Sequence, residues 1–147
     1  MSRGKPRERG QTVIEFALLA PVIFVLLFMI VDFGLALDRR ITLQHAVREG
    51  ARYAAVAGSN DCGKILEKTL AQAQGIDATV TVSYDADPGD PARLGDTVTV
   101  SAQFTYEPKI TNSIAGLLGV TAPSMVMTPS ASSRLEREVS PAAGCPP

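Results

Sequence analysis

Hydrophobic residues are concentrated in one long, unbroken run near the start of the chain. From Phe16 to Val31 sixteen residues pass without a polar side chain, and the run reaches Leu37 if Asp32 and Gly34 are allowed. At about 1.5 Å per residue, a helix over residues 16–37 is roughly 33 Å long, which covers a hydrocarbon core of about 30 Å. The run therefore predicts a membrane-spanning helix.

The helical pattern continues beyond the run to about Gly58, because the intervening residues include no proline. Ala46, Gly50 and Ala54 recur every four residues and form a smooth stripe on one face. Small side chains at this spacing let another backbone approach closely. That backbone could belong to a sheet or to a second helix. We expect the stripe to pack against the chain's own sheet, with contact to another subunit as the alternative.

A second, shorter helix is expected from Cys62 to Gln74, with Asp61 as its N-cap and Gly75 at its end. Three apolar positions share one face of this helix: Leu66, Leu70 and Ala73.

Alternation of apolar and polar residues then predicts strands. Period two holds over residues 79–84 and again over 96–108, and the Asp-, Pro- and Gly-rich residues between them indicate a hairpin turn. A loop with a short helical turn is expected over 109–120, and a third strand over 124–135 despite Pro129. The predicted class is α+β, a long helix packed on a small antiparallel sheet.

Charge is also uneven: the formal net charge is -1, but residues 1–10 carry four basic side chains and one glutamate. A basic head before an apolar run is typical of a membrane-targeting segment. A cleavable secretory signal is one interpretation, although its apolar core usually has only about 7–15 residues. An uncleaved signal anchor is another, with Glu15 and Asp32 at the two water interfaces.

A third interpretation starts from Gly10, four residues, Glu15 and Phe16 ahead of the apolar helix. This spacing resembles the prepilin motif, and "RGQTVIEFALLAPVIFVLLFMIVDFGLAL" resembles the TadE family of tight-adherence pilus pseudopilins. The likeness continues in "QHAVREGARYAAVAG", residues 44–58. The predicted α+β arrangement also agrees with a pilin-like fold.

The resemblance implies that a prepilin peptidase cuts between Gly10 and Gln11 at the cytoplasmic face. Glu15 would then be the fifth residue of the mature chain and would pair with the terminal ammonium of a neighbouring subunit, an ion pair that is strong in a low-dielectric setting. Gln11 departs from the apolar, N-methylated first residue of many type IV pilins.

The same motif decides the orientation, since basic residues precede and follow the span in nearly equal number. It implies a single-pass membrane protein with its N-terminus in the cytoplasm and its C-terminal domain outside, incorporated in a surface pilus. Five parts are expected: a leader (1–10), a transmembrane helix (11–37), a membrane-proximal helix extension (38–58), a small extracytoplasmic α+β domain (59–136) and a flexible C-terminal tail (137–147).

Other classes of function find little support. The near-neutral charge gives no argument for nucleic-acid binding. Asp85, Asp87 and Asp90 do not follow the EF-hand pattern, so we expect a solvated turn, no metal and no cofactor. His45 is the sole histidine and completes no nucleophile–base pair, so we expect no enzyme activity.

Cys62 and Cys145 are the two cysteines. Outside the cytoplasm they are a possible disulfide that would tie down the tail, and free thiols or an intermolecular bridge are the alternatives.

The sequence thus predicts a minor pilin or pseudopilin that takes part in assembly of a tight-adherence, Flp-type pilus. Its implied partners are the prepilin peptidase, the major pilin, other minor pilins and an inner-membrane assembly platform. The alternative is a signal-anchored extracytoplasmic binding domain unrelated to pili.

Overall fold

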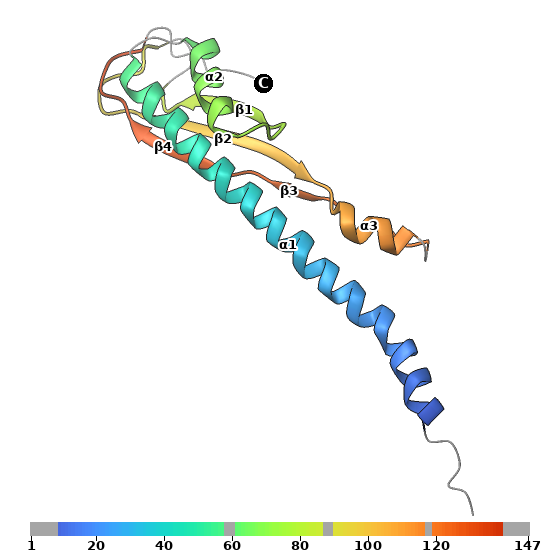
Figure 1. The fold of residues 1–147 in the computed structure, drawn as a ribbon. Helices are drawn as coiled ribbons and strands as arrows, with labels where there is room; N and C mark the ends of the chain where they lie inside the picture. The colour runs from blue at the N-terminus through green and yellow to red at the C-terminus, as the bar shows by residue number, and fades with distance from the viewer. Residues whose placement is uncertain (1–8, 58–60, 87–89, 117–118, 140–147) are drawn as a thin grey trace, which may run out of the picture. The chain divides into compact units, whose positions relative to one another are not determined.

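The computed structural model describes residues 9–57, 61–86, 90–116 and 119–139, with side chains described from residue 11 onward (Figure 1). The predicted α+β class is confirmed: a long apolar N-terminal helix is followed by a small antiparallel sheet. The chain divides into two compact units. The first comprises residues 1–35 and 108–123, and the second comprises residues 36–107 and 124–147.

Helix α1 runs from Arg9 to Ala57, 49 residues, and includes the whole apolar run. Pro21 lies inside it without ending it. A proline this far into a helix removes one backbone hydrogen bond, which an apolar helix tolerates when local adjustment satisfies the freed carbonyl. The helix ends one residue before the predicted Gly58, which lies outside the described residues.

The second unit is built on an antiparallel sheet whose central strand is β2 (Thr97–Tyr106). Strand β1 (Thr79–Tyr84) pairs with one edge of β2 in a register that places Val82 opposite Val100. The hairpin is therefore confirmed. Val80, Val82 and the alternate residues Val98, Val100 and Ala102 of β2 are all buried, as period two predicts for a half-buried sheet.

The other edge of β2 carries two short strands, β3 (Met125–Met127) and β4 (Ser130–Arg134). Together they occupy the place of the predicted third strand. The interruption falls at Pro129, which has no N–H for the ladder, although its carbonyl oxygen still accepts from the Ala102 N–H at 3.0 Å. The single strand predicted over residues 124–135 is therefore two strands, β3 and β4.

Helix α2 (Cys62–Gln72) begins as predicted, because the Asp61 side chain accepts from the Lys64 backbone N–H at 3.2 Å. It ends two residues before the predicted Gln74, since Gln74 and Gly75 both have positive φ. The predicted apolar face was wrong in part: Ile65, Thr69 and Ala73 are buried, whereas Leu70 is exposed.

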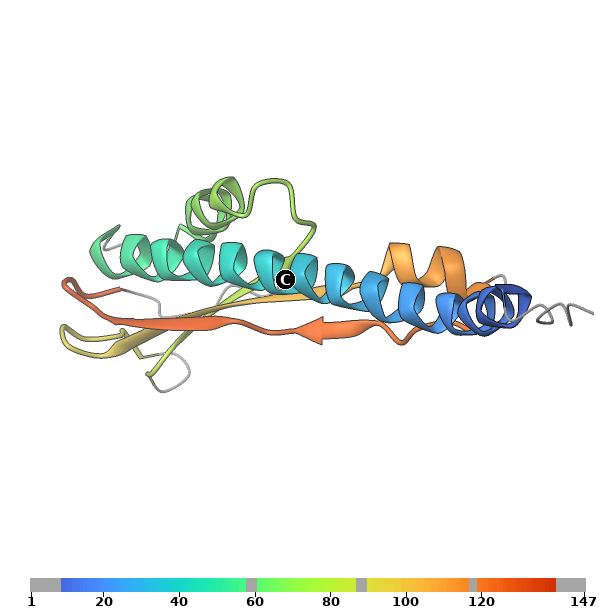
Figure 2. The ribbon, with the colours of Figure 1, turned by 60° about the horizontal axis from the view of Figure 1, so that its bottom comes forward.

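One hydrophobic core joins the second half of α1, α2 and the inner face of the sheet. In Figure 2 strands β2 and β4 run along one side of the second half of α1 while α2 lies on another. Residues that close the core come from late in the chain: Leu135 is buried, and Val139 is buried and exchanges two backbone hydrogen bonds with Ala92. Ordered structure therefore extends into the expected tail at 137–147, whose last eight residues lie outside the described part.

The first unit pairs the N-terminal part of α1 with helix α3 (Lys109–Ala115), which fulfils the predicted helical turn. Backbone bonds from Gly119 N–H to Gly116 O and from Val120 N–H to Ala115 O turn the chain back after the helix. The Ala122 N–H closes this turn by donating to Asn112 Oδ1 at 2.6 Å.

Candidate functional site

The N-terminal end of α1 carries the residues on which the sequence argument depends. Gly10 lies in the first turn, so the predicted cleavage point between Gly10 and Gln11 is helical. The side-chain amide of Gln11 donates to Oε1 of Glu15, about one turn further along the helix, at 3.2 Å. Both side chains are exposed, which leaves the Glu15 carboxylate accessible to a further partner.

Large apolar side chains surround Glu15 on every face of the helix. Four of these side chains are between 66% and 73% exposed: Val13, Ile14, Phe16 and Leu18. Successive residues of a helix point in different directions. A helix that is hydrophobic all round needs an apolar environment on all sides. By length and composition this helix could cross a membrane, as predicted, and none of its most apolar window is buried by the rest of the described chain.

The signal-anchor interpretation placed Asp32 at a water interface, and in the structure this side chain is buried within the chain. It is only 2% exposed, and its Oδ2 accepts from the backbone N–H of Thr111 at 2.6 Å. Thr111 is the third residue of α3, and the residue before that helix is Pro108, which provides no side-chain cap. The Asp32 carboxylate therefore caps α3 from another helix.

The small-residue stripe is buried within the chain. Ala46 and Ala54 are fully inaccessible, Gly50 is buried, and a Cβ added at Gly50 would overlap the hydroxyl of Thr69 in α2. Close approach of α2 thus accounts for the glycine. We expected this stripe to pack on the sheet, but the close neighbour of Gly50 is helix α2.

The opposite, solvated face of α1 carries local ion pairing, as its polar residues suggest. Arg52 Nη2 lies 2.6 Å from Glu49 Oε1, and both side chains are well exposed. The hydrogen bond from Arg52 lowers the pKa of Glu49 and, in return, raises that of Arg52. Exposed pairs of this kind contribute little to stability.

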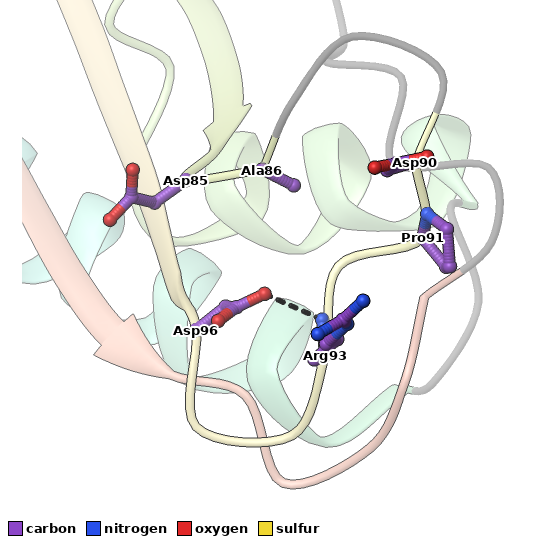
Figure 3. Close-up of a pocket in the computed structure, with 6 residues that line it drawn as sticks. All are labelled: Asp85, Ala86, Asp90, Pro91, Arg93 and Asp96. Atoms are coloured by element: carbon purple, nitrogen blue, oxygen red, sulfur yellow. Dashed lines mark hydrogen bonds between the residues drawn. The ribbon is translucent and has the colours of Figure 1, made fainter.

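A shallow hollow of about 420 Å³ lies beside the turn between β1 and β2 (Figure 3). Asp85 and Asp90 line opposite sides of it, and Asp96 Oδ2 accepts from the Arg93 N–H at 2.6 Å. Asp87 lies outside the described residues. Among the residues that the structure does describe, no three acidic, histidine or cysteine side chains gather closely enough to hold a metal ion.

Cys62 starts α2, is partly buried against the core and does not have a free thiol. Cys145 lies outside the described residues. The bridge between them therefore stays a prediction.

The segment from Gly10 to Arg52 contains the glycine and glutamate of the processing motif, the entire apolar run and most of the small-residue stripe. Residues 10–52 match the model of the TadE-like protein family. This match bears out the resemblance found in the sequence over these residues.

The TadE-like segment, residues 10–52, includes Glu15, Asp32 and Gly50 but ends before Ala54 and Cys62. No curated protein and no solved structure matches the chain.

Proposed function

We propose that this protein is a minor pilin or pseudopilin that takes part in assembly of a tight-adherence, type IVb (Flp-type) pilus. The observation that carries the proposal is the TadE-like match over residues 10–52, which begins at the glycine of the predicted cleavage point. In this proposal a prepilin peptidase removes residues 1–10, and the chain works by assembly without catalysis.

The exposed apolar helix supports two successive roles. Before assembly, lipid would surround its apolar faces, and in a filament the helices of neighbouring subunits would replace lipid. The proposed partners are accordingly the prepilin peptidase, the major pilin, other minor pilins and the inner-membrane assembly platform. The proposed topology places the N-terminus in the cytoplasm and the second unit outside.

Glu15 is the proposed assembly residue, because it is the sole acidic side chain between Gln11 and Val31. A carboxylate within an apolar layer is costly unless it is paired. The new terminal ammonium of a neighbouring subunit, freed by cleavage, is a partner of opposite charge at nearly the same depth. Such a pair would fix the register of one helix against the next.

The first test is the N-terminal residue of the protein isolated from its native membrane, by intact mass and terminal peptide sequencing. The proposal expects a start at Gln11. A Gly10→Val variant should accumulate a chain that still begins at Met1, because a branched side chain cannot enter a cleft that accepts glycine. Gly4→Val, in the same leader, is the matched control and should be processed normally.

Assembly is tested separately with Glu15→Ala, and with Asp38→Ala as an exposed acidic control further along the same helix. The proposal expects pilus production to fail with the first variant and to persist with the second, while both chains remain in the membrane. A start at Met1 together with normal function of Glu15→Ala would support a simple signal anchor instead, and a start near Leu37 would support a secreted domain.

A further inference from the structure

Residues 108–116 and 119–123, which we name the hook, belong to the same compact unit as the apolar part of α1. The hook joins β2 to β3. It carries one charged residue, Lys109, at its start. So few charges are compatible with an apolar environment.

The described backbone of the hook satisfies many of its own polar groups. Thr111 N–H is bound by Asp32, Asn112 N–H donates to Pro108 O, and the Ala122 N–H donates to the Asn112 side chain. Internal hydrogen bonding of this kind is what a segment requires where water is scarce. The turn leaves Val120 exposed by 58%.

Asp32 fixes where the hook lies along α1. Its carboxylate is in hydrogen-bond contact with Thr111, so the start of α3 is at the height of residue 32 on the helix. Asp32 precedes Leu37, the end of the apolar run, by five residues, or about 7.5 Å of helix. If the run spans a bilayer, the start of the hook lies inside the boundary of the apolar layer.

The chemistry of this contact suits that depth. A buried carboxylate is costly in an apolar layer, but the first turn of a helix presents unpaired N–H groups and a partial positive charge. Asp32 and α3 therefore satisfy each other. Lys109 is exposed in the first turn of α3, and its long side chain can reach the headgroups while the hook stays below them.

We propose that the hook inserts into the apolar layer of the leaflet at the C-terminal end of the span, below the headgroups, so that the protein contacts the bilayer through two elements. Asp32 is the positioning residue that holds the hook at this depth, and Val120 is the apolar contact with lipid. This inference rests on the membrane-spanning part of the proposed function, so its test includes a separate reporter for the span.

The chain has no tryptophan, so single-tryptophan variants report one position each. The full chain is reconstituted in phosphatidylcholine vesicles whose lipids carry bromine either just below the headgroup or near the acyl-chain end. Val120→Trp reports the hook, Phe24→Trp reports the middle of the span, and Leu94→Trp reports an exposed apolar residue of the second unit.

The proposal expects Val120→Trp to be quenched more strongly by the shallow bromines, and Phe24→Trp by the deep ones, with Leu94→Trp quenched by neither. Quenching of Phe24→Trp alone would overturn the hook while leaving the span in place. If Leu94→Trp is quenched as strongly as Val120→Trp, the protein adsorbs to the vesicles unspecifically, and the proposed insertion of the hook is overturned. Loss of quenching at Phe24 would overturn the span and the hook together.

The role of Asp32 is tested by adding Asp32→Ala to Val120→Trp, with Asp38→Ala as the matched control. We expect Asp32→Ala to remove most of the shallow quenching and to shift the emission to the red, whereas Asp38→Ala leaves both unchanged. Asp32→Asn retains an acceptor oxygen and should restore part of the quenching. Asp32→Ala combined with Phe24→Trp checks that the span stays inserted, and unchanged quenching at Val120 in Asp32→Ala would overturn the positioning role.

Discussion

The close approach of α1 to α2 at Gly50 makes a sharp prediction for Gly50→Ala. In an exposed helix interior this change would favour folding by about 1 kcal/mol, because alanine has the higher helix propensity. Here the new methyl group would overlap the Thr69 hydroxyl and lie 3.2 Å from Thr69 Cβ. The two effects therefore oppose each other, and their magnitudes decide the sign.

Thr69 cannot move out of the way easily. It is 1% exposed, and its hydroxyl donates to the Ile65 carbonyl oxygen at 2.8 Å, so rotation of the side chain would break that bond inside the core. Overpacking of a closed core costs about 1–3 kcal/mol, and a lost internal hydrogen bond about 1 kcal/mol. After subtraction of the propensity gain, we expect Gly50→Ala to destabilise the second unit by roughly 2 kcal/mol.

Tyrosine fluorescence during thermal unfolding in detergent micelles measures this change, because Tyr53, Tyr84 and Tyr106 all lie in the second unit. A domain of this size loses about 4–8 °C of Tm per kcal/mol. Gly34→Ala is the matched control in the same helix, since a Cβ there would meet nothing within 4 Å.

A second variant separates this clash from any other effect of alanine. Thr69→Ala removes the hydroxyl, so Gly50→Ala should cost much less in its presence than in the native chain, with a coupling energy of about 1–3 kcal/mol. The reasoning is refuted if Gly50→Ala is as harmless as Gly34→Ala, or if Thr69→Ala does not relieve it.

Three further predictions concern polar groups. The Thr111 hydroxyl is buried with no hydrogen-bond partner in the described part of the chain, because Asp32 binds the backbone N–H of this residue instead. Thr111→Val should therefore leave the free energy of unfolding unchanged or raise it by about 1 kcal/mol, as measured by denaturant unfolding. A clear loss of stability would mean that the hydroxyl is bonded. Burial raises the pKa of Tyr84 above its ordinary value of 10.0, so the folded state favours the neutral phenol. The free energy of unfolding of the native chain should therefore fall as the pH rises above 10.0. Tyr84→Phe should not show this fall. If Cys62 and Cys145 are bridged, the unfolded, non-reduced chain should resist alkylation, and reduction should lower stability by up to about 4.5 kcal/mol; alkylation without reductant would disprove the bridge.

Much of the fold could be predicted because its signals are local. Strand β1 has its predicted ends, Thr79 and Tyr84, since period-two alternation reports a half-buried strand directly. Asp61 caps α2 as expected, because the capping bond joins residues three apart. For the proposed processing and assembly residues Gly10 and Glu15, the sequence pattern and the TadE-like match supply the argument. The structure adds that Gly10 lies in the first turn of α1 and that Glu15 is exposed about one turn further along.

What the sequence could not determine is which distant partners meet. Asp32 and Thr111 are 79 residues apart, and an aspartate in an apolar run is equally compatible with a water interface or a buried cap. The buried face of α2 turned to Ile65 and Thr69 rather than Leu70 because Gly50 admits Thr69 at close range. Hydrophobic pattern and capping act over one or two turns and therefore fix the elements, whereas close packing and the pairing of buried polar groups select one arrangement of those elements only when the whole core closes.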